Sequence, residues 1–154
     1  MKRAICILSL VPLLVCSGQN VAPNAPKDKP VSATEKELAV LDKAIAPYVA
    51  KARATYPEAK KRYLAGLPAK HTFFLTARLR DKDGNFEQVF IAVDKIKDGN
   101  VTGRIWSDLN KVKGFKRGDS YTFAEKDMFD WLITKPDGSE EGNFVGNFLD
   151  TYKP

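Results

Sequence analysis

Beyond residue 16 this chain lacks cysteine. The 154-residue sequence contains two cysteines, Cys6 and Cys16. A domain that begins after them can form no internal disulfide and has no thiol nucleophile. Its stability must therefore come from a hydrophobic core, and residues 35–154 are long enough to build one, because single domains of about 100–150 residues are the commonest size.

Histidine is almost as scarce, since His71 is the only one. A metal site or a catalytic base needs partner residues, so we interpret this histidine, at the edge of a predicted strand, as structural. The chain has no Gly-x-Ser-x-Gly motif, and "GNFVGNF" at 142–148 lacks the glycine spacing of a dinucleotide-binding loop. The acidic stretch at 81–92 has Phe86 and Ala92 where an EF-hand loop requires Gly and Glu. The sequence predicts neither a metal site nor a cofactor.

Long apolar runs are also missing, apart from one at the N-terminus. Lys2 and Arg3 precede a nearly continuous apolar stretch from Ala4 to Cys16. This stretch is shorter than the about 20 residues that a membrane-spanning helix needs. A positive start followed by an apolar run of this length is typical of a signal peptide, here residues 1–18, and it predicts export.

Two kinds of processing fit this signal. Cleavage after Ser17 or Gly18 would release the protein, because small residues end the apolar run there. Alternatively, "LLVC" at 13–16 is similar to a bacterial lipobox and makes Cys16 a candidate for lipid attachment, although Val15 stands where Gly, Ala or Ser is preferred. Residues 19–34 are polar and contain three prolines, which is typical of a flexible tether. The tether favours a lipoprotein held at the bacterial envelope.

The formal net charge is +6, and it falls to +4 once Lys2 and Arg3 are removed. A basic balance is compatible with nucleic-acid binding, but an exported protein rarely meets nucleic acid. We therefore expect the charge to serve attraction to anionic envelope surfaces, or solubility.

The composition of the chain changes near residue 70. All nine phenylalanines and both tryptophans lie beyond it, whereas alanine is concentrated before it. The first part predicts two or three helices: Ser32 and Glu35 suggest a capping box, Pro47 predicts a kink or a break, and a second helix is expected from Thr55 to Leu64 or Ala65.

Strand-like alternation follows from His71. One side of "HTFFLTARLR" at 71–80 is apolar and the other polar, which predicts a half-buried strand, and "FEQVFIAVDKI" at 86–96 resembles an interior strand. Three Asp-Gly pairs mark hairpin turns, so neighbouring strands should be sequential and antiparallel. Segments 101–107, 120–123, 129–135 and 142–150 complete the predicted set of strands. We expect one α+β domain, residues 35–154, with helices packed on a strongly bent antiparallel sheet of five or six strands, or on a small, partly open barrel.

Several residues of the predicted sheet are candidates for a site. Trp131 should lie in the core with its indole N–H donating to an acceptor, and Asp130 could accept amides left unpaired at a corner. Arg104 and Trp106 share the face opposite Val101 and Ile105, and an Arg-Trp pair on an open face is typical of binding surfaces. The alternative, which we favour at this point, is that Trp106 is buried beneath the helices. Paired carboxylates remain a route to hydrolysis. The candidate acids are Glu87, Asp119, Asp130, Glu140 and Glu141.

The succession of motifs resembles the YegJ-like family of bacterial domains of unknown function. The resemblance covers residues 52–149 and includes Glu87 before an apolar strand, Gly103, the Gly118-Asp119 turn, the Asp130-Trp131 pair and Gly142-Asn143-Phe144. It implies an α+β fold and a binding role, because some relatives look like immunity or interaction modules. It also adds Asn143 to the candidate binding residues, which are Glu87, Arg104, Trp106, Asp130, Trp131 and Asn143.

The sequence thus favours an exported, periplasmic or lipid-anchored envelope protein that binds another protein or an envelope component without catalysis. The alternative is a small carboxylate-dependent hydrolase that acts on envelope sugar or peptide. We expect no nucleic-acid partner, and contact with the membrane only through the N-terminal lipid.

Overall fold

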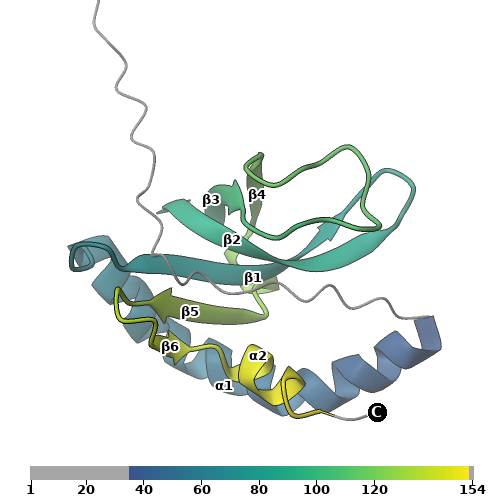
Figure 1. The fold of residues 1–154 in the computed structure, drawn as a ribbon, viewed down its shortest axis with the longest axis horizontal. Coiled ribbons are helices and arrows are strands. Elements are labelled where there is room, and N and C mark those ends of the chain that lie inside the picture. The colour runs from purple at the N-terminus through teal and green to yellow at the C-terminus, as the bar shows by residue number, and fades with distance from the viewer. Residues whose placement is uncertain (1–34, 153–154) are drawn as a thin grey trace, which may run out of the picture.

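A computed structural model of the chain describes residues 35–152 (Figure 1). The predicted signal peptide, the candidate lipid site Cys16, the tether at 19–34 and Ser32 of the predicted capping box lie outside the described residues.

One helix, α1 (Glu35–Ala65), forms the N-terminal part of the domain. The prediction of two or three separate helices is wrong, because α1 continues through both Pro47 and Pro57. Each proline removes one backbone hydrogen bond, yet a buried stripe made of Ile45, Ala52 and Tyr56 continues along the helix. We attribute the continuity to this shared apolar contact, and Figure 1 shows α1 curving beneath the sheet.

The end of α1 follows the prediction. Gly66 has a φ of +97° and its amide donates to the Tyr63 carbonyl. Glycine adopts this left-handed conformation without steric cost, and Pro68 cannot continue a helix.

Six antiparallel strands form the sheet. They are β1 (Thr72–Arg80), β2 (Phe86–Lys97), β3 (Asn100–Ile105), β4 (Ser120–Ala124), β5 (Asp130–Thr134) and β6 (Glu140–Gly142). Their order is β4-β3-β2-β1-β5-β6, so β2 is an interior strand as predicted, while β4 and β6 are edges. The α+β fold is therefore confirmed, and the sheet is not closed into a barrel.

The Asp-Gly pairs lie at hairpin turns, as predicted. They connect β1 with β2, β2 with β3, and β5 with β6. Both residues have positive φ only at Asp98-Gly99, which is the two-residue connection between β2 and β3. The other two turns are longer, and in each of them the glycine alone has positive φ.

Strand neighbours are not all sequential, which corrects the expected topology. After β4 the chain passes through a short 3₁₀ helix, η1 (Glu125–Asp127), and β5 then pairs with β1 instead of β4. Because β2 occupies only one edge of β1, the opposite edge is free to accept β5. This places Trp131 opposite Leu75, in the middle of the sheet.

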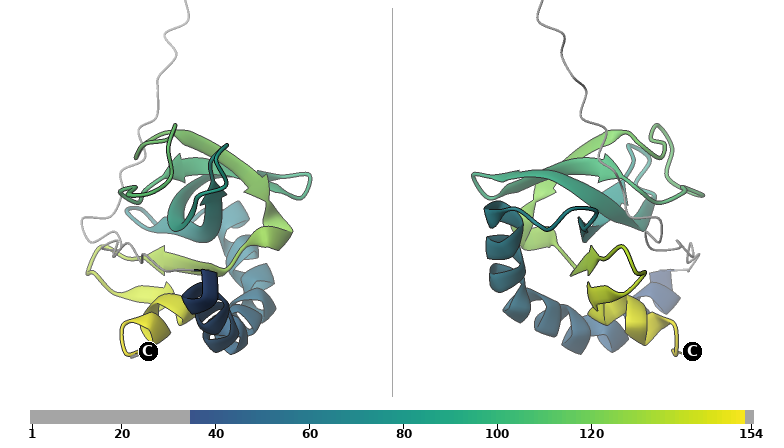
Figure 2. Two further views of the ribbon diagram at one scale, coloured as in Figure 1. Left: turned by 90° about the vertical axis from the view of Figure 1, so that its right-hand side faces the viewer. Right: turned by 60° about the vertical axis from the view of Figure 1, so that its left-hand side comes forward.

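The C-terminal segment is the other correction. Part of the predicted strand at 142–150 forms the helix α2 (Phe144–Leu149). Gly142 and Asn143 both have positive φ and turn the chain sharply at the end of β6. Phe148 then stacks on Tyr48 of α1 with 4.4 Å between ring centroids, so α2 lies beside α1 (Figure 2).

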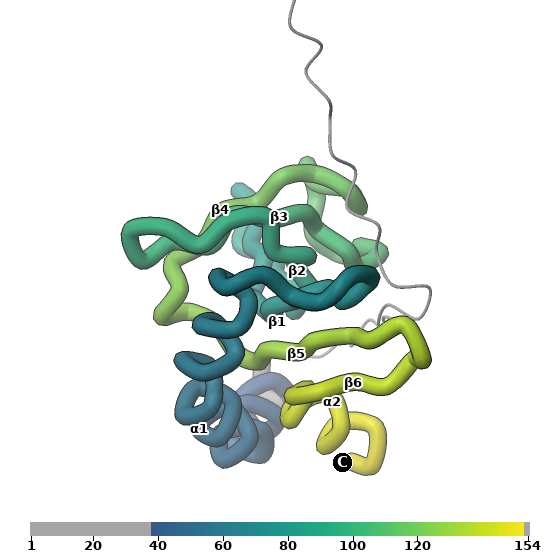
Figure 3. The backbone as a smooth tube through the Cα atoms, turned by 90° about the vertical axis from the view of Figure 1, so that its left-hand side faces the viewer, coloured from purple at the N-terminus to yellow at the C-terminus, as the bar shows by residue number. Residues whose placement is uncertain are grey.

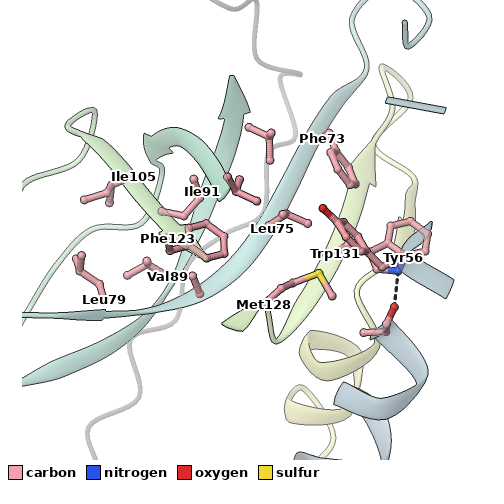
Figure 4. Packing of buried hydrophobic residues seen from close by; sticks show 14 of the residues in the cluster. Tyr56, Phe73, Leu75, Leu79, Val89, Ile91, Ile105, Phe123, Met128 and Trp131 are labelled. Atoms are coloured by element: carbon pink, nitrogen blue, oxygen red, sulfur yellow. Dashed lines mark hydrogen bonds between the residues drawn. The ribbon is translucent and has the colours of Figure 1, made fainter. Parts of the chain in front are cut away.

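The main core lies between α1 and one face of the sheet, and Figure 4 shows its central side chains. Phe73 and Leu75 of β1 point into it and are almost completely buried. The opposite face of β1 is also buried at Phe74, which contacts a smaller cluster containing Leu132. The prediction that β1 is half-buried is therefore wrong, because apolar groups cover both of its faces.

Candidate functional site

The Asp130-Trp131 pair is part of the architecture. The Trp131 indole N–H donates to the Ala52 carbonyl and to the Thr55 hydroxyl at 3.1 and 3.0 Å, which joins β5 to α1. The dashed line in Figure 4 marks the bond to the Ala52 carbonyl. This confirms the predicted core position and the predicted hydrogen bond. Gly142 is required beside it, because a Cβ there would lie 2.3 Å from the Trp131 carbonyl oxygen.

Asp130 is 1% exposed and accepts two backbone amides. Its carboxylate accepts the N–H of Trp131 at 2.8 Å and that of Val145, in the first turn of α2, at 2.6 Å. Burial raises its pKa to about 6, while the amide hydrogen bonds act in the opposite direction. As predicted, Asp130 accepts amides at a corner, and it links β5 to α2.

Asn143 is also occupied within the fold. Its side-chain amide donates to the Glu140 carboxylate at 2.6 Å, and its backbone carbonyl accepts the backbone amide of Asn147. Gly146 faces the Asn143 side chain, since a Cβ at Gly146 would lie 2.0 Å from Asn143 Oδ1. The motif Gly142-Asn143-Phe144 thus shapes the turn into α2.

Glu87 holds the long loop 106–119 in place. It is 9% exposed, and its carboxylate accepts the amides of Asn110 and Val112 at 2.9–3.1 Å. In the same region the Ser107 hydroxyl accepts the Phe90 amide. The ends of the loop are bonded to β2 and β3, where the Trp106 amide donates to the Phe90 carbonyl and the Gly118 amide to the Ile105 carbonyl. Glu87 therefore fixes the middle of the loop.

Glu87 and Asp130 lie on opposite faces of the sheet. Glu87 is opposite Leu79 of β1, whereas Asp130 is opposite Thr76, and residues three apart on a strand face opposite sides. These two acids cannot flank one substrate from the same face, as glycosidase chemistry requires.

The other candidate acids also have partners. The Glu141 carboxylate binds the Arg62 guanidinium, Glu140 accepts from Asn143, and Asp119 accepts the Lys116 amide. The Arg62 hydrogen bond holds the pKa of Glu141 below its usual range. Each acid named as a candidate therefore stabilises local structure.

Arg104 and Trp106 lie on the face opposite α1, on the register that the sequence predicted. The expectation that Trp106 is buried beneath the helices is wrong, because Trp106 packs beside Phe74 on the other face and is half-buried. The guanidinium carbon of Arg117 stands 4.4 Å above the Trp106 ring, and the Arg104 side chain donates to the Gly118 carbonyl at 3.3 Å. Trp106 also meets Phe74 edge-on, with 5.9 Å between ring centroids, and adjoins the half-buried Phe90.

We call the group formed by Phe90, Arg104, Trp106 and Arg117 the Trp106 surface. The Arg104 and Arg117 side chains are 56% and 47% exposed, so both guanidinium groups remain open to a partner. Sequence reasoning missed Phe90 and Arg117. The alternation of side chains along β2 places Phe90 on this face and could have identified it. Arg117 lies in an irregular loop, whose sequence has no strand or helix periodicity that would predict its position.

A comparison with known protein families shows which family the chain belongs to. The family described as uncharacterized protein conserved in bacteria (DUF2314) matches residues 42–150. The chain belongs to this family. The match extends over most of α1, all six strands and α2 of the DUF2314 domain. It confirms the expected bacterial domain of unknown activity, whereas the YegJ-like name stays a prediction. No curated protein and no solved structure matches the chain.

The described part of the DUF2314 domain was also searched for a metal site and for a membrane-spanning helix. Within residues 35–152, no group of three or more His, Cys, Asp or Glu residues is arranged to hold a metal ion. Asp81, from the EF-hand-like stretch, accepts the amides of Asp83, Asn85 and Lys113, as expected of a turn. Neither α1 nor α2 combines the length and the apolar character that crossing a membrane would take.

Proposed function

We propose that this DUF2314 domain is a non-catalytic interaction module of the bacterial envelope that binds another protein through the Trp106 surface. The observation that carries the proposal is the stacked Arg117–Trp106 pair beside Arg104, exposed on the sheet face opposite α1. Arginine and tryptophan are enriched among the residues that dominate binding energy at protein interfaces.

The charge around this surface indicates the chemistry of the partner. Loop 106–119 contains four basic and two acidic residues, and the exposed Arg104 adds a further positive charge beside it. Asp94 and Asp108 approach the two guanidinium groups only to 3.8 and 3.6 Å, and exposed ion pairs of this kind are weak enough for a partner to replace. Complementary charge accelerates association and excludes partners of like charge. We therefore expect the partner to present acidic side chains around an apolar or aromatic group that covers Trp106.

The alternative, a carboxylate-dependent hydrolase, has less support. Glu87 and Asp130 lie on opposite faces of the sheet, and each accepts two backbone amides. A catalytic carboxylate must reach substrate, whereas these two are directed at the protein's own backbone. A raised pKa like that of Asp130 is common at catalytic sites, but at 1% exposure this carboxyl group has no open path to substrate.

Export and lipid attachment at Cys16 belong to the same proposal. The basic start, the apolar run and the Pro-containing tether support it. Mass spectrometry of the mature N-terminus, purified from a bacterial host, tests it. An acylated Cys16 is the expected result, and an unmodified N-terminus at residue 18 or 19 would contradict lipid attachment.

Affinity purification from solubilised membranes tests the binding role. The wild-type domain should recover one stoichiometric partner, and the double variant Arg104→Glu, Arg117→Glu should lose it through charge reversal. Lys97→Glu, a charge reversal at an exposed hairpin position, serves as the matched control and should retain the partner. Equal recovery by all three proteins would contradict the proposed surface.

A further inference from the structure

A concave pocket lies at the C-terminal end of α1, away from the Trp106 surface. It has a volume of about 340 Å³ and is lined by residues of α1, of the segment 66–71, which follows α1, and of the β5–β6 hairpin. Figure 3 shows the backbone of these segments. This volume is within the range of small-molecule sites, which begins near 300 Å³. Its lining includes Arg62, Leu67, Pro68, His71, Lys135 and Glu141.

Positive groups converge on one carboxylate in this pocket. The Arg62 guanidinium binds both oxygens of Glu141, at 2.6 and 2.9 Å. Charge from Arg62, Lys135 and His71 lowers the pKa of Glu141, in addition to the larger effect of the Arg62 hydrogen bond. The bidentate pair neutralises Glu141, and the Lys135 ammonium then adds a further positive charge to the pocket.

Two side chains of the pocket remain to bind a ligand, the Lys135 ammonium and the His71 imidazole. The Lys135 ammonium makes no hydrogen bond or ion pair within the described part of the chain, although its charge contributes to the lowered pKa of the exposed Asp137. The Nδ1 nitrogen of His71 lies 3.2 Å from the Ala69 carbonyl, which can only accept, so Nδ1 carries a proton and Nε2 is the nitrogen left for a ligand. The His71 and Lys135 side chains are half-buried, which strengthens their hydrogen bonds relative to those made in open water.

The rest of the wall is apolar. Leu67 and Pro68 line the pocket beside Ala65, at the end of α1. A ligand that fits both parts has an anionic head and an apolar body. A fully polar anion would leave the apolar wall without a contact, and a hydrocarbon would leave the Lys135 ammonium without an acceptor.

We propose that this pocket binds a carboxylate with a short apolar body, with the carboxylate held by Lys135 and His71 and the body against Leu67 and Pro68. The carboxylate belongs either to a free small acid or to the C-terminus of a peptide, because both present the same chemistry. The proposal is independent of the Trp106 surface, which uses other residues on β2, β3 and loop 106–119.

Charge and geometry leave the ligand's carboxylate one arrangement in the pocket. The charged groups beside His71 are Arg62 from α1, Lys135 after β5, and Glu141 from β6. Because the Arg62 guanidinium is held by both oxygens of Glu141, Lys135 is the cation left to meet a ligand. Nε2 of His71 donates to the ligand when the imidazole carries both protons, the form that a neighbouring carboxylate favours.

The single histidine makes this pocket easy to observe. The ring C–H signals of His71 in an NMR spectrum of the full chain report on this site alone. We would titrate the protein at pH 6 with hexanoate, with a peptide that ends in a free leucine carboxylate, and with the same peptide carrying a C-terminal amide. The two carboxylates should shift the signals saturably and the amide should not. Tighter binding of hexanoate would identify a free acid as the ligand class, and tighter binding of the peptide a chain terminus.

Variants separate specific binding from a general salt effect. Lys135→Ala removes one charged hydrogen bond and should weaken binding roughly tenfold. Lys95→Ala removes an exposed lysine outside the pocket and should change nothing. A lack of saturable shifts with both carboxylates, equal shifts with the amide, or equal affinity of the Lys135→Ala protein would overturn the proposal.

Discussion

The buried Asp130 carboxylate should make the stability of the domain depend on pH in an unusual direction. Its pKa rises from 3.8 to about 6 on folding, chiefly because burial disfavours the charged form. The folded state therefore binds the proton more tightly than the unfolded chain does. The stability that comes from this proton is fully present below pH 3.8, decreases as the pH rises, and is lost above about pH 6.

The magnitude follows from the size of the change. Each pKa unit corresponds to about 1.4 kcal/mol, so the free energy of unfolding should lose about 3 kcal/mol between pH 3.8 and pH 7 through this group alone. Other carboxyl groups titrate in the same range. For this reason the quantity to measure is the difference in unfolding free energy between the wild-type protein and Asp130→Asn, in which those contributions cancel.

Urea denaturation of both proteins at pH 4, 5, 6 and 7 gives this difference. The substituted side chain has one carbonyl oxygen in place of two carboxylate oxygens, so it accepts only one amide well, which adds a constant cost of about 1 kcal/mol. Relative to the variant, the wild-type protein should be most stable at pH 4 and should lose its advantage by pH 7. Asp137→Asn is the control with the opposite slope, because the Ser139 side chain and amide lower the pKa of Asp137. Parallel curves for the wild-type protein and Asp130→Asn would refute the reasoning.

Three further changes test the architecture. Trp131→Phe removes the indole hydrogen bonds to α1 and should lower the unfolding free energy by about 1–2 kcal/mol in urea denaturation, and an unchanged midpoint would contradict it. Gly142→Ala should cost more than about 2 kcal/mol, because a Cβ there meets Trp131 at 2.3 Å, whereas Gly84→Ala, also at positive φ but in open space, should cost about 1 kcal/mol in thermal melts. Glu87→Ala leaves two amides unpaired and should increase hydrogen exchange at the Val112 amide at least tenfold, while Glu87→Gln should restore part of the protection.

The sequence predicted the elements whose signals are local. The Asp-Gly turns, the Gly66 end of α1 and the core position of Trp131 each follow from a few neighbouring residues. The placement of Arg104 and Trp106 on one face followed from a period of two along β3.

The errors arose where distant contacts override a local preference. Pro47 and Thr55 suggested breaks, but buried residues continue across both positions, from Ile45 to Ala52 and Tyr56, and the last two pack in the main core. Segment 144–149 alternates as a strand would, and its helical form depends on the Asp130 carboxylate, which lies 15 residues from Val145 in the sequence. The pairing of β5 with β1 has no local signal at all.

In the candidate site, too, local features were predictable and those that depend on distant contacts were not. Glu87 shows the physical reason. A carboxylate before an apolar strand resembles a functional group in the sequence, but its task here depends on loop 106–119, whose conformation no periodicity predicts. By accepting the Asn110 and Val112 amides on the core side of the sheet, Glu87 fixes the loop that places Arg117 above Trp106 on the other side. The buried acid and the exposed pair are therefore parts of one arrangement, in which Glu87 positions the binding surface and does not itself touch a partner.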